Sequence, residues 1–287
     1  MRPDPSPLTV AGGSWRGVPS PEPSQRIASA DRTPIALFAS GDGPPLLLVH
    51  GAAADHTTFR VIGPRLATSF TVQAMDRRGR GSSGDTAPYS IQREFEDIAA
   101  VAEALAAETG TPVAVLGHSY GGRCALGAAL LTDRIASVIC YEGAPAPPGA
   151  TYEPDSIKAR VRARLEAGDL AGLLANFMTD VVGMTPEELA HYRADPIWPV
   201  RVAAAGTIPR ELDAETDPAA TLDRLGAVRQ PVLQVLGSDS RSIFREATLA
   251  LDERLANGRV VEIAGAKHAA HHTHPDAMIE AVRDFIG

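Results

Sequence analysis

Residues 113–122 read Val-Ala-Val-Leu-Gly-His-Ser-Tyr-Gly-Gly, and this stretch decides the fold. It begins as a short apolar run typical of a buried strand, and an alanine- and leucine-rich run of helical type continues from Gly122 to Asp133. Between them lies Gly117-x-Ser119-x-Gly121. In a strand–turn–helix context this pattern marks a nucleophile elbow, a sharp turn that projects a serine side chain from the sheet. The glycines leave room for the turn because they carry no Cβ. The stretch therefore predicts that Ser119 is a nucleophile.

Strand and helix patterns alternate on both sides of this stretch. Upstream, strand patterns cover residues 25–30, 35–40, 45–49 and 70–75, and helical patterns cover 56–67 and 90–108. Downstream, strand patterns cover 136–141, 231–236 and 259–263, and helical patterns cover 244–256 and 275–286. The first two strands are expected to form a hairpin. Such alternation predicts a parallel sheet with helices on both faces.

Strand patterns are missing from Gly143 to about Ala227. A proline-rich exit at 144–149 leads into helical patterns at 154–167, 170–182, 186–194 and 198–207. The third begins Thr185-Pro186-Glu187-Glu188, with proline and acidic residues in the first turn, where a helix favours them. We therefore expect a core of residues 25–142 and 228–287 that is interrupted by a helical cap, residues 143–227. Residues 1–24, rich in Pro, Gly and Ser, are expected to form a flexible arm.

The composition excludes several classes of partner. The chain has 287 residues, 44% of them hydrophobic, a formal net charge of −8 and a pI near 5.5. These values predict no basic surface for nucleic acid or an anionic membrane. Cys124 and Cys140 lie in apolar runs and are interpreted as buried free thiols. No signal-peptide pattern or membrane-spanning run is found, so we expect a cytoplasmic protein. The sequence does not indicate an oligomeric state.

Several ordered motifs resemble the α/β-hydrolase superfamily, in particular its capped esterase, haloperoxidase and dehalogenase-like branch. The motifs are His50-Gly51, the glycine-rich turn Asp76 to Gly84, the elbow Gly117 to Gly121, and Gly265-Ala266-Lys267-His268 followed seven residues later by Pro275. The resemblance extends from about Arg26 to the C-terminus, and only the cap aligns poorly. It implies an α/β-hydrolase fold: a mostly parallel eight-stranded sheet with helices on both faces and the helical cap inserted after strand 6.

A serine nucleophile needs a base, and His268 is the candidate. The Ser119 hydroxyl is too weakly acidic to attack unaided. His268 lies in a loop after the last strand, from which it could reach the elbow. The resemblance implies two backbone donors for the oxyanion. One is Tyr120, the residue after the nucleophile, and the other is Ala52, the residue after His50-Gly51.

Two residues are candidates for the carboxylate that would bind and orient His268. Asp239 is in the usual position for the family, but the pattern there is commonly Gly-x-x-Asp, and Ser240 occupies that slot after Gly237. Glu142 ends the strand before the cap, where some members of the dehalogenase-like branch carry the acid. A carboxylate at the end of a buried strand needs a partner to offset its desolvation, and the histidine would supply one. We favour Glu142. The alternatives are a turn-capping role for Asp239 and, for Glu142, a position at the entry to the cap.

No metal or organic cofactor is expected. His271, His272 and His274 cluster near His268, but no carboxylate or cysteine spacing completes a ligand set. Neither a phosphate-binding loop nor a dinucleotide fingerprint is found.

Dehalogenases and epoxide hydrolases of this fold carry an aspartate at the elbow, and this aspartate is alkylated during their reaction. The present chain carries Ser119 at that position, which excludes their mechanism. Five apolar cap residues could line a substrate pocket or form the core of the cap: Phe177, Met178, Met184, Trp198 and Ile208.

These observations predict a serine hydrolase that cleaves small-molecule carboxylic esters of small to medium, largely apolar substrates through an acyl-enzyme. Ser119 attacks, His268 transfers the proton and Glu142 orients the imidazole, while Ala52 and Tyr120 bind the oxyanion. The same triad could instead serve a cofactor-free haloperoxidase, a perhydrolase or a C–C bond hydrolase. The alternative from another class is a non-catalytic ligand receptor of the same fold, since fold alone does not choose the function.

Overall fold

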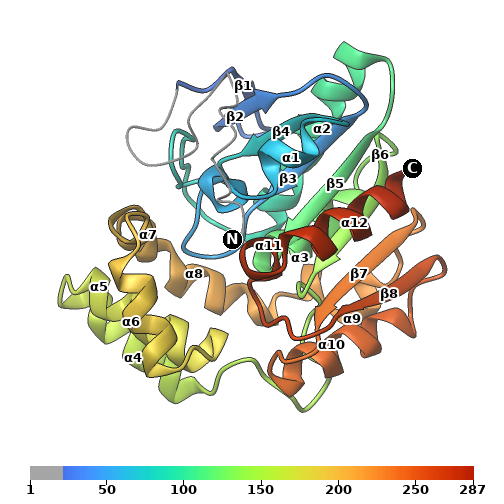
Figure 1. The fold of residues 1–287 in the computed structure, drawn as a ribbon. Coiled ribbons are helices and arrows are strands. Elements are labelled where there is room, and N and C mark those ends of the chain that lie inside the picture. Colours follow the sequence, from blue (N-terminus) through green and yellow to red (C-terminus); the bar gives the residue numbers. More distant parts are fainter. Residues whose placement is uncertain (1–21) are drawn as a thin grey trace, which may run out of the picture.

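A single mixed sheet organises the protein. In this computed structural model, which describes residues 22–287, eight strands run in the order β1-β2-β4-β3-β5-β6-β7-β8. They are β1 (Gln25–Ala28), β2 (Pro34–Ser40), β3 (Pro45–Val49), β4 (Thr71–Met75), β5 (Val113–His118), β6 (Ile135–Tyr141), β7 (Val232–Gly237) and β8 (Gly258–Ile263). The pairs β1–β2 and β2–β4 are antiparallel, and every later pair is parallel. The predicted fold class, a mostly parallel eight-stranded sheet, is confirmed (Figure 1).

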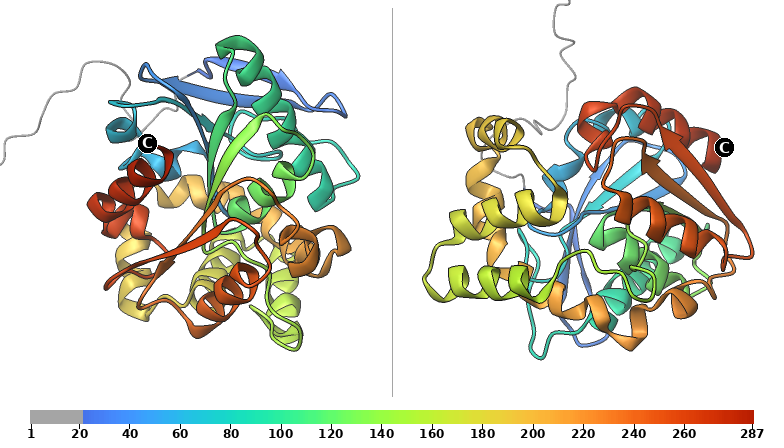
Figure 2. Two further views of the ribbon diagram at one scale, coloured as in Figure 1. Left: turned by 90° about the vertical axis from the view of Figure 1, so that its right-hand side faces the viewer. Right: turned by 90° about the horizontal axis from the view of Figure 1, so that it is seen from below.

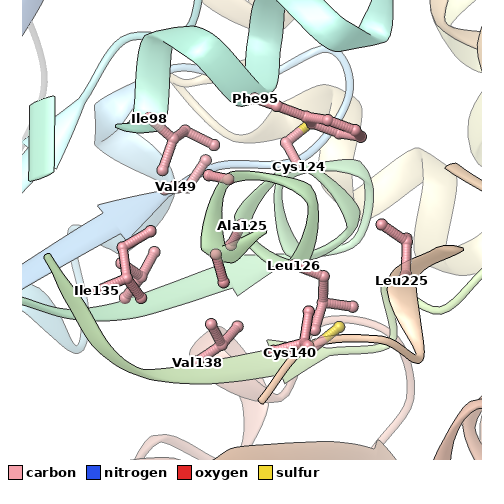
Figure 3. Close-up of a cluster of buried hydrophobic side chains, with 14 of the residues drawn as sticks. Val49, Phe95, Ile98, Cys124, Ala125, Leu126, Ile135, Val138, Cys140 and Leu225 are labelled. Atoms are coloured by element: carbon pink, nitrogen blue, oxygen red, sulfur yellow. The ribbon is translucent and has the colours of Figure 1, made fainter. Parts of the chain in front are cut away.

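The helices of the core cover both faces of the sheet. They are η1 (His56–Phe59), α1 (Gly63–Leu66), α2 (Ile91–Thr109), α3 (Tyr120–Ala129), α10 (Ser242–Asp252), α11 (Ala270–Thr273) and α12 (Pro275–Ile286). Along β3 the buried side chains alternate, so that Leu47 and Val49 join one apolar cluster and Leu46 and Leu48 join the other. The first cluster packs under α2, α3 and α10, and Figure 3 shows part of it. The second packs under α1 and α12.

The residues between β6 and β7 form helices only. They are α4 (Asp155–Glu166), α5 (Leu170–Phe177), η2 (Met178–Val182), α6 (Pro186–Ala194), α7 (Trp198–Ala204), η3 (Ala205–Thr207), α8 (Ile208–Asp213), η4 (Ala214–Thr216), η5 (Pro218–Ala220) and α9 (Leu222–Leu225). Helices α4 to α7 group together to one side of the strands in Figures 1 and 2. Their side chains form a separate apolar cluster, which Ala53, from the loop after β3, also joins.

Local chemistry explains where the elements differ from the expected ones. The helix expected over residues 56–67 is broken into η1 and α1. Pro64 occupies the first turn of α1 and has no N–H to continue a helix from η1. The stretch 170–182 changes from α-helix to a π-helical turn at Met178. Most of the expected arm, residues 1–21, lies outside the described residues. Ser24 is already paired with the sheet, because its N–H donates to Leu37 O at 2.8 Å.

Membrane-spanning helices are missing from the described part of the chain, residues 22–287, where no helix combines sufficient length with sufficient apolarity.

A substitution at Gly121 tests how tightly α3 packs against the sheet. A Cβ at this position would lie 2.3 Å from His50 O and 2.5 Å from Val49 O, both backbone atoms at the end of β3. We expect Gly121→Ala to lower the free energy of unfolding by about 1–3 kcal/mol, because β3 or α3 must shift. Urea unfolding measures the change. The control is Gly63→Ala, whose Cβ would meet nothing closer than Phe59 Cβ at 3.8 Å and should change stability by less than about 1 kcal/mol. Equal losses in the two variants would contradict the close-packing argument.

Candidate active site

Ser119 occupies the strained turn between β5 and α3. Its backbone has φ 54° and ψ −126°, and its N–H donates to Tyr141 O at 2.7 Å. A Cβ on Gly117 would lie 2.4 Å from Gly121 O, so only glycine allows the strand and the helix to approach this closely. Among the described residues, the Ser119 side chain makes no capping bond to α3. The hydroxyl is therefore not occupied by the helix that follows it.

Strained backbone gathers at the carboxyl ends of the central strands. Of the four non-glycine residues with positive φ in the described chain, three follow β3, β5 and β6: Ala53 (φ 50°), Ser119 (φ 54°) and Glu142 (φ 48°). Each such conformation costs on the order of 1–3 kcal/mol, which the surrounding packing must offset. Strain of this kind concentrates where geometry is imposed on functional groups.

The structure brings Glu142 and His268 into direct contact. His268 Nδ1 lies 2.5 Å from Glu142 Oε2. The other carboxylate oxygen, Oε1, accepts from Gly237 N at 2.8 Å and from the Ser240 hydroxyl at 2.6 Å. Glu142 is only 3% exposed, so this buried carboxylate is satisfied by three donors. Ser240, the residue in the slot expected for an aspartate, positions the glutamate.

Asp239 lies elsewhere. Its carboxylate is exposed and accepts from the hydroxyl of Ser238 at 2.8 Å, while its N–H donates to Ala266 O at 2.9 Å. Within residues 22–287, the carboxylate bonded to the His268 ring is that of Glu142. Within residues 22–287 the Asp239 carboxylate is thus bonded to the side chain of its neighbour Ser238, and the turn-capping alternative stays a prediction.

Three aromatic residues hold the His268 loop. The Tyr141 hydroxyl donates to Lys267 O and accepts from Ala270 N at 2.9 Å. His118 Nε2 donates to His268 O at 2.8 Å, and burial together with the neighbouring His268 keeps the pKa of His118 well below its usual range. The Phe244 ring stacks on the His268 ring with centroids 4.4 Å apart. Sequence reasoning assigned no role to these residues, although His118 stands inside the elbow motif.

Ala52 and Tyr120 lie beside Ser119. A Cβ on Gly51 would lie 3.1 Å from Ser119 Cβ, which places the Ala52 backbone beside the serine. Tyr120 is the first residue of α3, so its N–H has no acceptor one turn earlier in the helix. Both residues line a pocket with Ser119. The assignment of these two N–H groups to an oxyanion stays a prediction.

An arginine fixes the loop that carries Ala52. Arg77 donates to Gly51 O at 3.1 Å and to Glu94 Oε1 at 2.7 Å, and it also bonds to Glu211 of α8. Burial lowers the pKa of Arg77, but Glu94 and Glu211 outweigh it and hold the pKa well above its usual range. Glu211 also bonds to Arg80. The glycine-rich turn is visible in the sequence, but its carboxylate partner in α8, 134 residues away from Arg77, is not.

Ser119 and His268 line two adjoining pockets. The larger, about 780 Å³, is within the range of small-molecule sites and is also lined by Phe177, Met178 and Met184. The smaller is about 40 Å³. Trp198 and Ile208, the other two apolar candidates, pack in or against the cluster of the helical segment. Phe177, Met178 and Met184 also belong to this cluster or pack against it, so these three side chains line the pocket and contact the core of the helical segment.

The histidines after His268 also line the larger pocket. Burial lowers the pKa of His271 well below its usual range and, with Arg60, lowers that of His272 to about 3. Both imidazoles are therefore neutral near pH 7. Across residues 22–287, no cluster of three or more His, Cys, Asp or Glu side chains has an arrangement suited to a metal ion.

The sequence as a whole matches a known family. The model of the alpha/beta hydrolase family covers residues 46–281, which include every part of the site described above. The chain belongs to the alpha/beta hydrolase family, and the resemblance stated from its motifs is confirmed. The protein is a hydrolase.

Particular relatives cover nearly the whole chain. The 2-(acetamidomethylene)succinate hydrolase of Mesorhizobium japonicum is 30% identical over 91% of this chain and 94% of its own. A pimeloyl-[acyl-carrier protein] methyl ester esterase of Aeromonas hydrophila is 29% identical over 88% and 99%. The crystal structure of an alpha/beta hydrolase from Sphaerobacter thermophilus superposes with a TM-score of 0.79 and 33% identity, covering 92% of this chain and 100% of that one.

Glu211 offers a stability test of the buried ion network. Glu211→Ala leaves Arg77 and Arg80 short of one buried carboxylate, and we expect a loss of about 3–5 kcal/mol in the free energy of unfolding. The matched control is Asp213→Ala on the same helix, which breaks a half-exposed pair with Arg162 and should cost less than about 1 kcal/mol. Urea denaturation compares them. Similar small losses in both variants would show that the network does not stabilise the fold.

Proposed function

We propose that this hydrolase cleaves carboxylic esters through a serine acyl-enzyme. The observation that carries the proposal is the buried contact between His268 Nδ1 and Glu142 Oε2 at 2.5 Å, in a histidine that shares its pocket with Ser119. A carboxylate on Nδ1 fixes the imidazole tautomer whose Nε2 accepts a proton. That is the arrangement a serine needs in order to attack a carbonyl carbon.

The proposal assigns one or more residues to each step of the reaction. The Ser119 hydroxyl attacks the ester carbonyl while His268 takes its proton, and Glu142 stabilises the imidazolium that forms. The N–H groups of Ala52 and Tyr120 donate to the oxyanion of the tetrahedral intermediate. His268 then protonates the departing alcohol. Water, activated by the same histidine, releases the acyl group and restores the serine.

The helical residues 143–227 act in this proposal as a cap over the core of residues 25–142 and 228–287. Their helix α5 and the following π-helical turn contribute Phe177 and Met178 to the larger pocket, which also contains Ser119. Apolar lining and a volume of about 780 Å³ suit small to medium apolar acyl or alcohol groups. A similar protein is named as a methyl ester esterase, which supports an ester as the substrate.

A second candidate reaction uses the same serine on a substrate that is not an ester. It is favoured by the 30% identity to a 2-(acetamidomethylene)succinate hydrolase over 91% of this chain. The two candidates differ in the bond that is cleaved and not in the residues proposed to cleave it.

Ser119→Ala tests the nucleophile. The wild type is assayed on p-nitrophenyl acetate, butyrate, hexanoate and octanoate, and we expect hydrolysis with a preference for one chain length. The variant should lose several orders of magnitude in turnover on every ester, because the acyl-enzyme cannot form. Circular dichroism and thermal melting check that it is folded. Turnover like that of the wild type in the folded variant would remove Ser119 from the mechanism.

The identity of the carboxylate that assists His268 is tested by replacing each candidate with the amide of the same size. Glu142→Gln keeps the shape of the side chain but removes the charge that stabilises the imidazolium, so we expect turnover to fall by on the order of 10⁴. Asp239→Asn changes an exposed carboxylate bonded to Ser238 and should leave turnover within a factor of about three. Both are assayed on one ester across pH. A large loss in Asp239→Asn with normal rates in Glu142→Gln would reverse the assignment.

A further inference from the structure

Glu153 is a buried carboxyl group in the smaller pocket that the proposed reaction does not use. The residue is 2% exposed and lines the pocket with Ser119 and His268. Neither of its carboxyl oxygens has a hydrogen-bond partner among the described residues. The nearest cation is Lys158, whose Nζ lies 3.8 Å from Oε1, too far for a hydrogen bond. Buried polar groups are nearly always bonded, so both oxygens of Glu153 have the capacity to accept hydrogen bonds from a bound group.

The segment that carries Glu153 is fixed against the proposed catalytic histidine. Thr151 Oγ1 donates to Glu153 O at 2.7 Å, and the Tyr152 hydroxyl donates to Ala144 O at 2.6 Å. The Tyr152 ring packs on Phe244 with centroids 5.2 Å apart, and Phe244 in turn stacks on His268. One aromatic side chain therefore separates the Glu153 segment from the imidazole. Glu153 is held at the pocket and is not a side chain of a mobile surface loop.

The smaller pocket has an excess of acidic groups. Four glutamates and one arginine line it: Glu142, Glu153, Glu211, Glu215 and Arg123. Arg123 is already paired with Glu215 at 2.7 Å, and Glu142 is satisfied by His268, Gly237 and Ser240. Glu211 is held by Arg77 and Arg80 through Oε1, but its Oε2 also has no hydrogen-bond partner within residues 22–287. Three acceptor oxygens on two side chains are thus unbonded at one small pocket.

We propose that Glu153 and Glu211 bind a primary ammonium group of the substrate, so that the favoured esters are amino esters. An ammonium carries three N–H donors and one positive charge, which match the three acceptor oxygens without hydrogen bonds on Glu153 and Glu211. The pocket volume of about 40 Å³ holds roughly three water-sized groups, so the cation is compact. A guanidinium or a trimethylammonium group is too large. This inference names the substrate class of the proposed ester hydrolysis and rests on that proposal.

The charges around Glu153 make this recognition depend on pH. Burial and the neighbouring Glu215 raise the pKa of Glu153 to about 8, against weaker lowering by Lys158, Arg123 and Arg241. Below this pKa the group is protonated, and an ammonium must displace that proton in order to bind. The preference for the amino ester is therefore smallest near pH 6, rises as the pH approaches 8, and then levels off.

The decisive comparison uses two series of methyl esters. Methyl esters of ω-amino acids from β-alanine to 6-aminohexanoate are compared with the methyl alkanoates in which CH₃ replaces NH₃⁺, by titrating the acid released. At one matched length we expect kcat/KM to favour the amino ester by about tenfold or more at pH 8. Glu153→Gln should remove the preference and its rise with pH, so that the amino ester and the alkanoate are hydrolysed with similar kcat/KM. Glu166→Gln on α4 removes an exposed charge and should retain the preference.

A binding measurement tests the same site without catalysis. Calorimetric titration with n-butylammonium chloride at pH 8 should show binding to the wild type and to Glu166→Gln, and about tenfold weaker binding to Glu153→Gln. Equal binding to all three proteins, or to none, overturns the inference, and so does an amine preference that survives in Glu153→Gln. Hydrolysis of the alkanoates without any amine preference overturns only this inference. Failure to hydrolyse either series, with n-butylammonium binding intact, overturns only the ester proposal.

Discussion

The backbone of Ser119 is held between three strands at once. Its N–H bonds to Tyr141 O at the end of β6, and the glycines on either side of it allow α3 to cross within contact distance of β3 and β5. Because backbone atoms occupy the space that a Cβ would need at Gly117 and Gly121, the crossing cannot loosen without separating strands. The same packing supplies the energy that keeps Ser119 at positive φ. The direction of the serine side chain thus follows from how the sheet is built.

A second constraint joins the helical segment to this crossing. Arg77 lies between the loop after β3 and Glu211 of α8, so one guanidinium bonds both to backbone beside Ser119 and to a residue of the segment above it. Buried ion pairs often contribute little net stability, because desolvation offsets the attraction. Their directional bonds nevertheless penalise other arrangements, since moving α8 away would leave charges buried and unpaired. The position of α8 above the pocket is therefore specified by charge as well as by apolar contact.

Alternation of strand and helix patterns was enough to predict most of the fold. The run 45–49 became β3 with its predicted bounds, and the amphipathic spacing of 90–108 became α2, because in both cases one local period determines which side chains are buried. Prediction failed where a local rule competes with that period. Pro64 divides the helix expected over 56–67, and α11 is a single turn, too short to produce a period. The bounds of the helical segment depend on packing between short helices, which local patterns do not encode.

The candidate site was likewise predictable only in part. Ser119 and His268 were selected because each stands in a local motif, and Glu142 because a carboxylate ending a buried strand requires a partner. The roles of all three as nucleophile, base and acid stay predictions. Glu153 could not be found, since no local motif marks it and the residues that line the pocket with it, among them Arg123, Glu211 and Phe244, come from other parts of the chain. An unpartnered buried carboxyl lowers stability, and exchanging it for an apolar side chain would remove that cost. Such a group persists in a folded protein most readily where a ligand completes it. A cation in the smaller pocket would do so, and it would lie beside the serine where the bond is proposed to break.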